Sequence, residues 1–510
     1  MTAEQYEGRP EMAIKAFPDT LEWLNVPAPL TIDMLRGKII ILHFWTYGHV
    51  NCLHMLPVLR KIGQKYPDEV VIIGVHAPKF TNEGRNAQLR HALARYNVTH
   101  PVINDKALAL WQAFQVQAWP TFGVIDPRGN LLAMQGAEIP FEGFDQLLSG
   151  MVHHFDALGE LDRSPLPNPA VSTDDTEQVL RYPGKILIDA EGDRLFVADS
   201  GHHRIVVLDL NTYAVLDVIG SGQRGYEDAS FAAAQFNSPQ GMALKNGLLY
   251  IADAGNHAVR SVDFSTRTVR TLAGTGYLGL GIMTVGTKIR EPRAFDLRSP
   301  WDVAAGAGDT LFIALAGTHQ IAEINLQSRV MRVSVGNGYE GLRNDTLGTS
   351  ALAQPSGLYF ENGLLYSVDS AASSIRVADF TNDTVRTLAG PIEDNLFAFG
   401  NKDGQIGTSR LQHPMGITGD GDGLLYIVDT YNHALKSIDA TTKTTTLIGS
   451  EAGYADGDAA VARFNAPGGV AYHAGKLYIA DTNNHVVRVI DADSLHVDTF
   501  KITSVSHSDE

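Results

Sequence analysis

His49 and Cys52 are the residues whose types and spacing suggest covalent chemistry. Cys52 is the only cysteine in the 510-residue chain, so no disulfide can form within one molecule. A cysteine thiolate is a nucleophile, and a histidine three positions earlier lies on the same helical face and can pair with it. Such a monothiol would react through mixed disulfides with an external reductant. The alternative is that Cys52 is a small buried packing residue, as free cysteines commonly are.

The segment that positions this pair has the pattern of an α/β sandwich. Apolar runs bounded by turn residues predict strands, and apolar spacing of three and four predicts helices. The sequence predicts alternating strands and helices over 38–48, 51–66, 70–77, 85–96 and 105–114, followed by a strand and a turn over 118–130. Strands that alternate with helices form one layered domain, which we place at residues 1–157.

The tract FWTYGHVNC, which ends at Cys52, resembles the active-site segment of thioredoxin-like proteins. Trp119-Pro120-Thr121 is similar to the cis-proline loop that faces it. The resemblance implies that His49 stands where the family has the nucleophilic cysteine, and that Cys52 has the resolving position. It also implies that Pro120 either exposes backbone groups to a substrate peptide or serves only the fold. Trp119 is a further candidate contact residue.

A phrase that returns six times predicts the architecture of the second half. Its best copies are GLLYIADAGNHAVRSVD, GLLYIVDTYNHALKSID and GKLYIADTNNHVVRVID. Each unit predicts four short antiparallel strands with Asn-Gly or Gly-Asn turns, and six such units predict a six-bladed β-propeller. The aligned positions are Asp199, Asp253, Leu315, Asp369, Asp429 and Asp481. We place the propeller at residues 179–510, after a Pro-, Ser- and Asp-rich linker at 158–178.

The repeats resemble the NHL repeat family, and together the two domains resemble the NHL repeat-containing protein 2 family. The resemblance implies a thioredoxin-like α/β domain followed by an all-β six-bladed NHL propeller. Animal members carry a further β-rich domain, so we expect a bacterial-type relative without it. Leu315 replaces the repeated Asp and Ser373 replaces the repeated His, so weaker turns are expected in blades three and four.

Five repeated histidines admit two interpretations. They are His203, His257, His319, His433 and His485. One interpretation is a ring of metal ligands, but equivalent positions on different blades lie around a circle and do not converge. The other is that each side chain satisfies polar groups near its turn. We favour the second, and expect neither a metal site nor a cofactor site.

Long, related segments precede several blades and all open on one face of the propeller. Loops on a rigid scaffold commonly carry binding. The segments contain aromatic residues, of which we expect Tyr226, Tyr339 and Tyr454 to contact a ligand. Phe236 and Phe464 lead directly into inner strands, and we expect them to pack between blades.

Charge and hydropathy narrow the class of partner. The net charge of −17 argues against non-specific binding of nucleic acid, which depends on Lys and Arg. No apolar run reaches the roughly 20 residues of a membrane helix. The segment MTAEQYEGRPEMA lacks the pattern of a signal peptide, which predicts a cytoplasmic location.

These observations predict a non-enzymatic binding or scaffold protein. Its propeller face would hold a protein, a peptide or a small ligand, and its thioredoxin-like domain would lack the N-terminal redox cysteine. The alternative is a thiol-dependent oxidoreductase or isomerase that uses Cys52. His49 in the nucleophile's position favours the first hypothesis.

Overall fold

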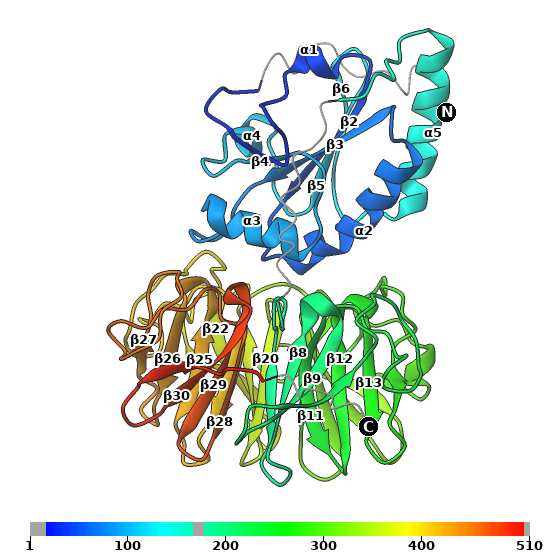
Figure 1. The fold of residues 1–510 in the computed structure, drawn as a ribbon. Coiled ribbons are helices and arrows are strands. Elements are labelled where there is room, and N and C mark those ends of the chain that lie inside the picture. The colour runs from blue at the N-terminus through cyan, green and yellow to red at the C-terminus, as the bar shows by residue number, and fades with distance from the viewer. Residues whose placement is uncertain (1–16, 167–177, 504–510) are drawn as a thin grey trace. The chain divides into compact units, whose positions relative to one another are not determined.

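The structure is a computed structural model that describes residues 17–166 and 178–503. The chain divides into two compact units, Met1–Thr176 and Glu177–Glu510. The first unit is a sheet flanked by helices, and the second is a ring of sheets (Figure 1). The predicted linker at 158–178 includes residues 167–177, which lie outside the described residues.

The first unit has the expected thioredoxin-like fold, an α/β sandwich around one sheet. Its strands are β1 (Glu22–Leu24), β2 (Ile39–Trp45), β3 (Val70–His76), β4 (Val102–Asn104), β5 (Thr121–Ile125) and β6 (Leu131–Gly136). Its helices are α1 (Ile32–Leu35), α2 (Val50–Lys65), α3 (Asn86–Arg95), α4 (Ala109–Ala113) and α5 (Phe141–Ala157). The strand order is β1-β4-β3-β2-β5-β6, with β2 parallel to β3 and antiparallel to β5.

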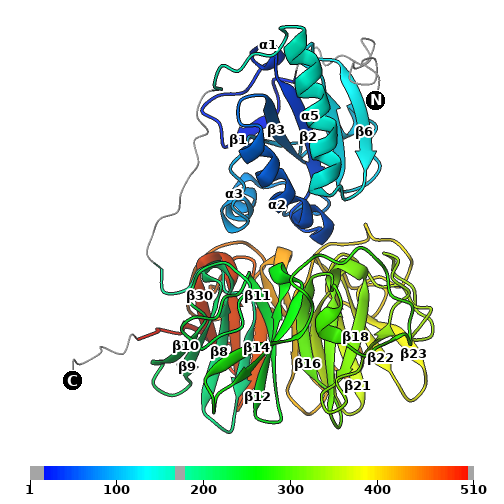
Figure 2. The same cartoon turned by 90° about the vertical axis from the view of Figure 1, so that its right-hand side faces the viewer.

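Helix α5 is the longest element of this unit that the sequence analysis did not predict; β1, α1, β4 and β6 are the shorter ones. Its residues Phe144, Leu148, Met151 and Phe155 are buried and recur at helical spacing. They pack in one cluster with residues of α2 such as Leu59, and the two helices lie side by side (Figure 2). Our sequence interpretation ended at the turn after β5, so this helix was missed.

The second unit is the predicted six-bladed propeller. Blade one consists of β7 (Ile186–Asp189), β8 (Arg194–Asp199), β9 (Arg204–Asp209) and β10 (Val215–Ile219), and blade two of β11 (Pro239–Lys245), β12 (Leu248–Asp253), β13 (Ala258–Asp263) and β14 (Thr268–Ala273). Blade three consists of β16 (Pro300–Ala305), β17 (Thr310–Leu315), β18 (Gln320–Asn325) and β19 (Met331–Val335), and β15 (Lys288–Ile289) pairs with β19 at its outer edge.

Blades four to six repeat the same antiparallel order. Blade four consists of β20 (Pro355–Glu361), β21 (Leu364–Asp369), β22 (Ser374–Asp379) and β23 (Thr384–Ala389). Blade five consists of β24 (Gly416–Gly419), β25 (Leu425–Asp429), β26 (Ala434–Ile438) and β27 (Thr444–Ile448). Blade six consists of β28 (Gly469–His473), β29 (Lys476–Asp481), β30 (Val486–Asp491) and β31 (Val497–Thr499). The first strand of each blade contacts the first strand of a neighbouring blade, which makes these strands the inner wall of the ring.

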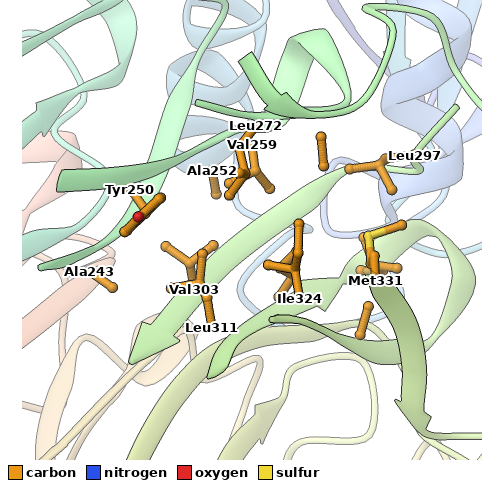
Figure 3. Packing of buried hydrophobic residues seen from close by; sticks show 14 of the residues in the cluster. Ala243, Tyr250, Ala252, Val259, Leu272, Leu297, Val303, Leu311, Ile324 and Met331 are labelled. Carbon is orange, nitrogen blue, oxygen red and sulfur yellow. The ribbon is translucent and has the colours of Figure 1, made fainter. Parts of the chain in front are cut away.

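Apolar side chains from facing sheets form the core between adjacent blades. Between blades two and three, Tyr250 and Leu272 meet Leu311, Ile324 and Met331 (Figure 3). Because strand residues alternate between the two faces of a sheet, each blade supplies one apolar set to each neighbour. The core therefore runs around the ring.

The ring closes through contacts between contiguous blades. Blade one and blade six are each built from consecutive strands. Thr503, beyond β31, forms a parallel bridge with Ala214, and the ring of Phe500 lies 3.9 Å from that of Tyr213. The chain end is thus joined to the segment before β10 by an isolated bridge, and no strand is shared between blades one and six.

An ion pair fills the centre of the ring. In every blade a proline lies at or just before the beginning of the inner strand. Two positions after this proline, four blades have a glycine, whereas blade one has Lys185 and blade three has Asp302. Lys185 Nζ lies 3.7 Å from Asp302 Oδ2 and donates to the Met415 carbonyl of blade five. Burial lowers the pKa of Lys185 and raises that of Asp302. The pair thus connects alternate blades across the axis.

Candidate functional site

His49 and Cys52 lie at the beginning of α2, as the sequence predicts. His49 is the residue that caps the helix, and its Nδ1 atom is 3.8 Å from the Cys52 Sγ atom. Cys52 is 0% exposed and His49 only 7%. A buried thiol is inaccessible to another protein's disulfide. The geometry therefore supports the packing interpretation of Cys52.

The cis-proline loop lies where the resemblance implies. The Trp119–Pro120 peptide bond is cis. Because Phe44 pairs with Thr121, Pro120 lies beside the carboxyl end of β2, the end from which the chain leads into α2. The Trp119 indole donates a hydrogen bond to the Ala77 carbonyl at 3.0 Å and packs against Trp111, with ring centroids 4.5 Å apart. Trp119 is half-buried and held in place by these contacts.

Glu83 is a residue of this region that we missed in the sequence. Its Oε1 atom accepts a hydrogen bond from the Gly48 N–H at 2.9 Å, and its Oε2 atom accepts from Lys79 and Phe80 at 2.8 and 2.9 Å. Burial raises the pKa of the Glu83 carboxyl. This side chain fastens the segment before α2 to the segment after β3, so Glu83 positions the beginning of the helix.

The repeated Asp of the propeller organises the turn between the second and third strands. In blade two, Asp253 Oδ1 accepts from the Asn237 N–H at 2.8 Å, and Oδ2 accepts from Asn256 and Arg260 at 2.8 and 2.9 Å. Burial raises the pKa of Asp253 to about 6, which leaves it ionised at neutral pH beside the buried Arg260. Equivalent pairs are Asp369 with Arg376, Asp429 with Lys436, and Asp481 with Arg488.

Blade three replaces this ion pair with two neutral residues. By strand register, Leu315 takes the place of the Asp and Ala322 takes the place of the cation, and both are fully buried. The Gln320 amide donates to the carbonyls of Met283 and Gly336 at 2.7 and 2.9 Å. Loss of one charge alone would leave the other buried without a partner, which is costly. The paired replacement explains how this turn is retained.

The repeated His links each blade to the next. In blade one, His203 Nδ1 accepts a hydrogen bond of 3.1 Å from the Ser238 N–H of blade two. In four other blades the histidine Nδ1 atom accepts a hydrogen bond from the equivalent backbone N–H; the donor and acceptor pairs are Ser299 and His257, Gln354 and His319, Ala466 and His433, and Tyr182 and His485. In blade four, Ser373 Oγ accepts instead from the His413 N–H. The structural interpretation of the histidines is confirmed. Ser373, where a weaker turn was expected, keeps the link.

The candidate tyrosines belong to loops that lead from the outer strand of one blade to the inner strand of the next. We call these the entry loops, residues 220–238, 274–299, 336–354, 390–415 and 449–468. In the loop of blade two, Asp228 accepts hydrogen bonds from Arg260 and Thr271 at 2.8 and 2.9 Å. The equivalent residues are Asn344, Asp403 and Asp456. Four entry loops are thus clamped to the blade that they precede.

This clamp divides the three candidate tyrosines into two kinds. Tyr226 and Tyr454 both lie two positions before the clamped residue, and each covers a buried arginine, with ring centroids 5.1 and 5.0 Å from the guanidinium carbon. They are 36% and 57% exposed. Tyr339 has no such arginine in the described structure and is 71% exposed. Its resemblance to the other two in sequence does not reflect an equivalent position.

Phe236 and Phe464 lie against the same arginines. Their ring centroids lie 5.2 and 5.4 Å from the guanidinium carbons of Arg260 and Arg488, and both phenylalanines are fully buried. They pack in the cores between blades, as the sequence analysis expected.

Comparisons with known proteins agree with this architecture. A family model described as thioredoxin-like matches residues 37–131, and one described as NHL repeat matches residues 236–260. NHL repeat-containing protein 2 of Homo sapiens is 35% identical over 526 residues, which cover 96% of this chain and 72% of the human protein. The chain belongs to the NHL repeat-containing protein 2 family.

Two other relatives match different lengths of this chain. Protein SUPPRESSOR OF QUENCHING 1, chloroplastic, of Arabidopsis thaliana is 40% identical over 497 residues, and the chain covers 46% of its length. Thiol-disulfide oxidoreductase YkuV of Bacillus subtilis is 28% identical over 114 residues, which cover 22% of this chain and 76% of YkuV. The chain thus spans less than half of the plant relative. Among the helices that the structure describes, none has the length and apolar character needed to cross a membrane.

Proposed function

We propose that this member of the family is a non-enzymatic binding protein that holds a protein partner on the entry-loop face of its propeller. The observation that carries the proposal is where apolar side chains are exposed. Of the twelve large apolar residues exposed in the described part of the propeller, ten belong to the entry loops. Monomeric proteins rarely expose such clusters unless they bind something.

The first unit supports the same proposal. Its single thiol is buried and has a histidine where a thioredoxin-like nucleophile would lie. The helix and cis-proline loop that position a redox pair in the family are present, but the chain has one cysteine. We infer that this unit is a second docking surface or a structural support, and that it does not exchange disulfides.

Cross-linked capture from cells with single-site variants tests the proposal. Tyr339→Ser and Phe397→Ser alter exposed side chains of the entry loops, so they should lose captured proteins while keeping the melting temperature. Cys52→Ser should keep them. Retention of every captured protein by both entry-loop variants, or loss of all of them in Cys52→Ser, would contradict the proposal and favour thiol chemistry.

A further inference from the structure

Three stretches of the entry loops join into one surface. They are residues 277–282, 337–342 and 392–397, which precede blades three, four and five. Ile282 lies against Gly338, where an added Cβ atom would be only 2.0 Å from the Ile282 Cγ2 atom. The Leu342 N–H donates to Asp394 Oδ1 at 2.8 Å. The first stretch therefore contacts the second, and the second contacts the third. We call this surface the entry-loop patch.

The entry-loop patch is apolar. Its exposed apolar residues are Tyr277, Leu280, Ile282, Tyr339, Ile392 and Phe397. Leu280 is 92% exposed, although burial of a leucine side chain is favourable. Several such residues on neighbouring loops are typical of a surface that a partner covers.

The entry-loop patch is also acidic. Its three stretches contain Glu340, Glu393 and Asp394 and no Lys or Arg. Two cations border them: Arg343 pairs with Asp345 at 3.7 Å, and the Arg298 guanidinium donates hydrogen bonds to the carbonyls of Gly279 and Gly317. Apolar side chains interspersed with carboxylates match a partner that carries apolar and basic residues together.

We propose that the entry-loop patch docks a basic amphipathic segment of another protein. This rests on the proposed function and adds the chemistry of the partner and its place on the face. A second copy of the chain is a poor fit, because each copy carries a net charge of −17 and presents the same acids, so that like charges would meet. A helix with one apolar and one basic side satisfies both features of the patch.

A synthetic helical peptide of leucine and lysine is the probe, with a leucine and glutamate peptide as its control. Fluorescence anisotropy with the full chain should show binding of the lysine peptide that weakens as salt increases. Glu393→Lys should weaken this binding about tenfold and strengthen binding of the glutamate peptide. Phe397→Ser should weaken it by a similar factor. Leu216→Ser, at an exposed residue of β10 outside the entry loops, should bind like the natural protein.

Equal affinity of all variants for the lysine peptide, at matched melting temperatures, would overturn the proposal. So would sedimentation showing a natural dimer that Phe397→Ser dissociates, because the occupant would then be a second copy. Loss of cellular partners in the patch variants, combined with no preference between the two peptides, would reject the basic partner while leaving the binding function in place.

Discussion

His485 Nδ1, in the last blade, accepts a hydrogen bond of 3.0 Å from the Tyr182 N–H, in the first blade. The two residues are 303 positions apart, and their rings are in edge contact at 4.4 Å. Thr482 adds a hydrogen bond of 2.8 Å to the Pro183 carbonyl. The same histidine bond joins blades two and three through His257, where the chain also connects the blades. The junction of blades six and one therefore depends on non-covalent contacts alone.

Replacement of this histidine should weaken the junction. His485→Gly removes the acceptor and suits the left-handed backbone at this position (φ 60°), so its effect reports the loss of this bond and of the ring contact with Tyr182. An unsatisfied buried N–H costs about 1 to 3 kcal/mol. His257→Gly is the matched control, and we expect the smaller fall in melting temperature there because the chain still holds blades two and three together. Equal falls in the two variants would show that the junction is no weaker than the others.

The charged pair of blade two should behave as a unit. Asp253→Leu leaves Arg260 buried beside an apolar side chain and should cost about 3 to 5 kcal/mol of stability, as should Arg260→Ala through the reverse loss. The double variant copies Leu315 and Ala322 of blade three and should recover part of the loss. Denaturant unfolding of all four proteins gives the coupling energy. Strictly additive losses would mean that the pair does not explain the substitution found in blade three.

His203 should make stability depend on pH. Burial, together with the nearby Arg224, lowers its pKa to about 4, well below its usual 6.5. Its unprotonated Nδ1 atom accepts the hydrogen bond from the Ser238 N–H. A pKa that is lower in the folded state means that the unfolded state binds more protons between these values. The contribution of His203 is thus complete above pH 6.5 and is lost as the pH falls through about 4.

His203→Asn isolates this contribution, because asparagine does not titrate and tolerates the left-handed backbone (φ 54°). The free energy of unfolding of the natural protein, measured relative to this variant, should fall between pH 7 and pH 4. A constant difference across that range would contradict the assignment.

Cys52 should be inert in the folded protein. A maleimide should label it only after unfolding, since the side chain is 0% exposed, and the natural protein should not reduce insulin. His49→Cys restores a Cys-x-x-Cys pair at positions whose side chains already lie 3.8 Å apart, so the two thiols should disappear on mild oxidation. Insulin reduction by the natural protein that Cys52→Ser abolishes would overturn the binding hypothesis.

Local patterns sufficed to predict most elements of the fold. The short apolar run in GLLYIAD, bounded by turn residues, indicates a strand that is buried on both faces. With AVRSVD it matches β12 and β13. The helix around Cys52 was predicted from apolar spacing along α2. Helix α5 has an equally clear spacing at Phe144, Leu148 and Met151, so its omission was an error of interpretation and not a limit of the sequence.

Local sequence patterns could not show which residues of the entry loops are equivalent from blade to blade. Tyr226 and Tyr339 both follow a glycine and precede a glutamate, which suggested one class of residue. The position of Asn344, bonded to Arg376 at 3.0 Å as Asp228 is to Arg260, makes Leu342 the counterpart of Tyr226. Loop residues are aligned by what they bond to, and their bonding partners lie on strands some 30 residues away.

By itself, the sequence determined the number of blades and the absence of an intrachain disulfide. The first follows from counting a repeated unit, and the second from counting cysteines. Only the tertiary structure decided that Cys52 is buried, that each repeated histidine bonds to the next blade, and that Lys185 meets Asp302 at the centre. Each of these depends on which group a distant part of the chain presents, and a pattern of neighbouring residues carries no information about that group.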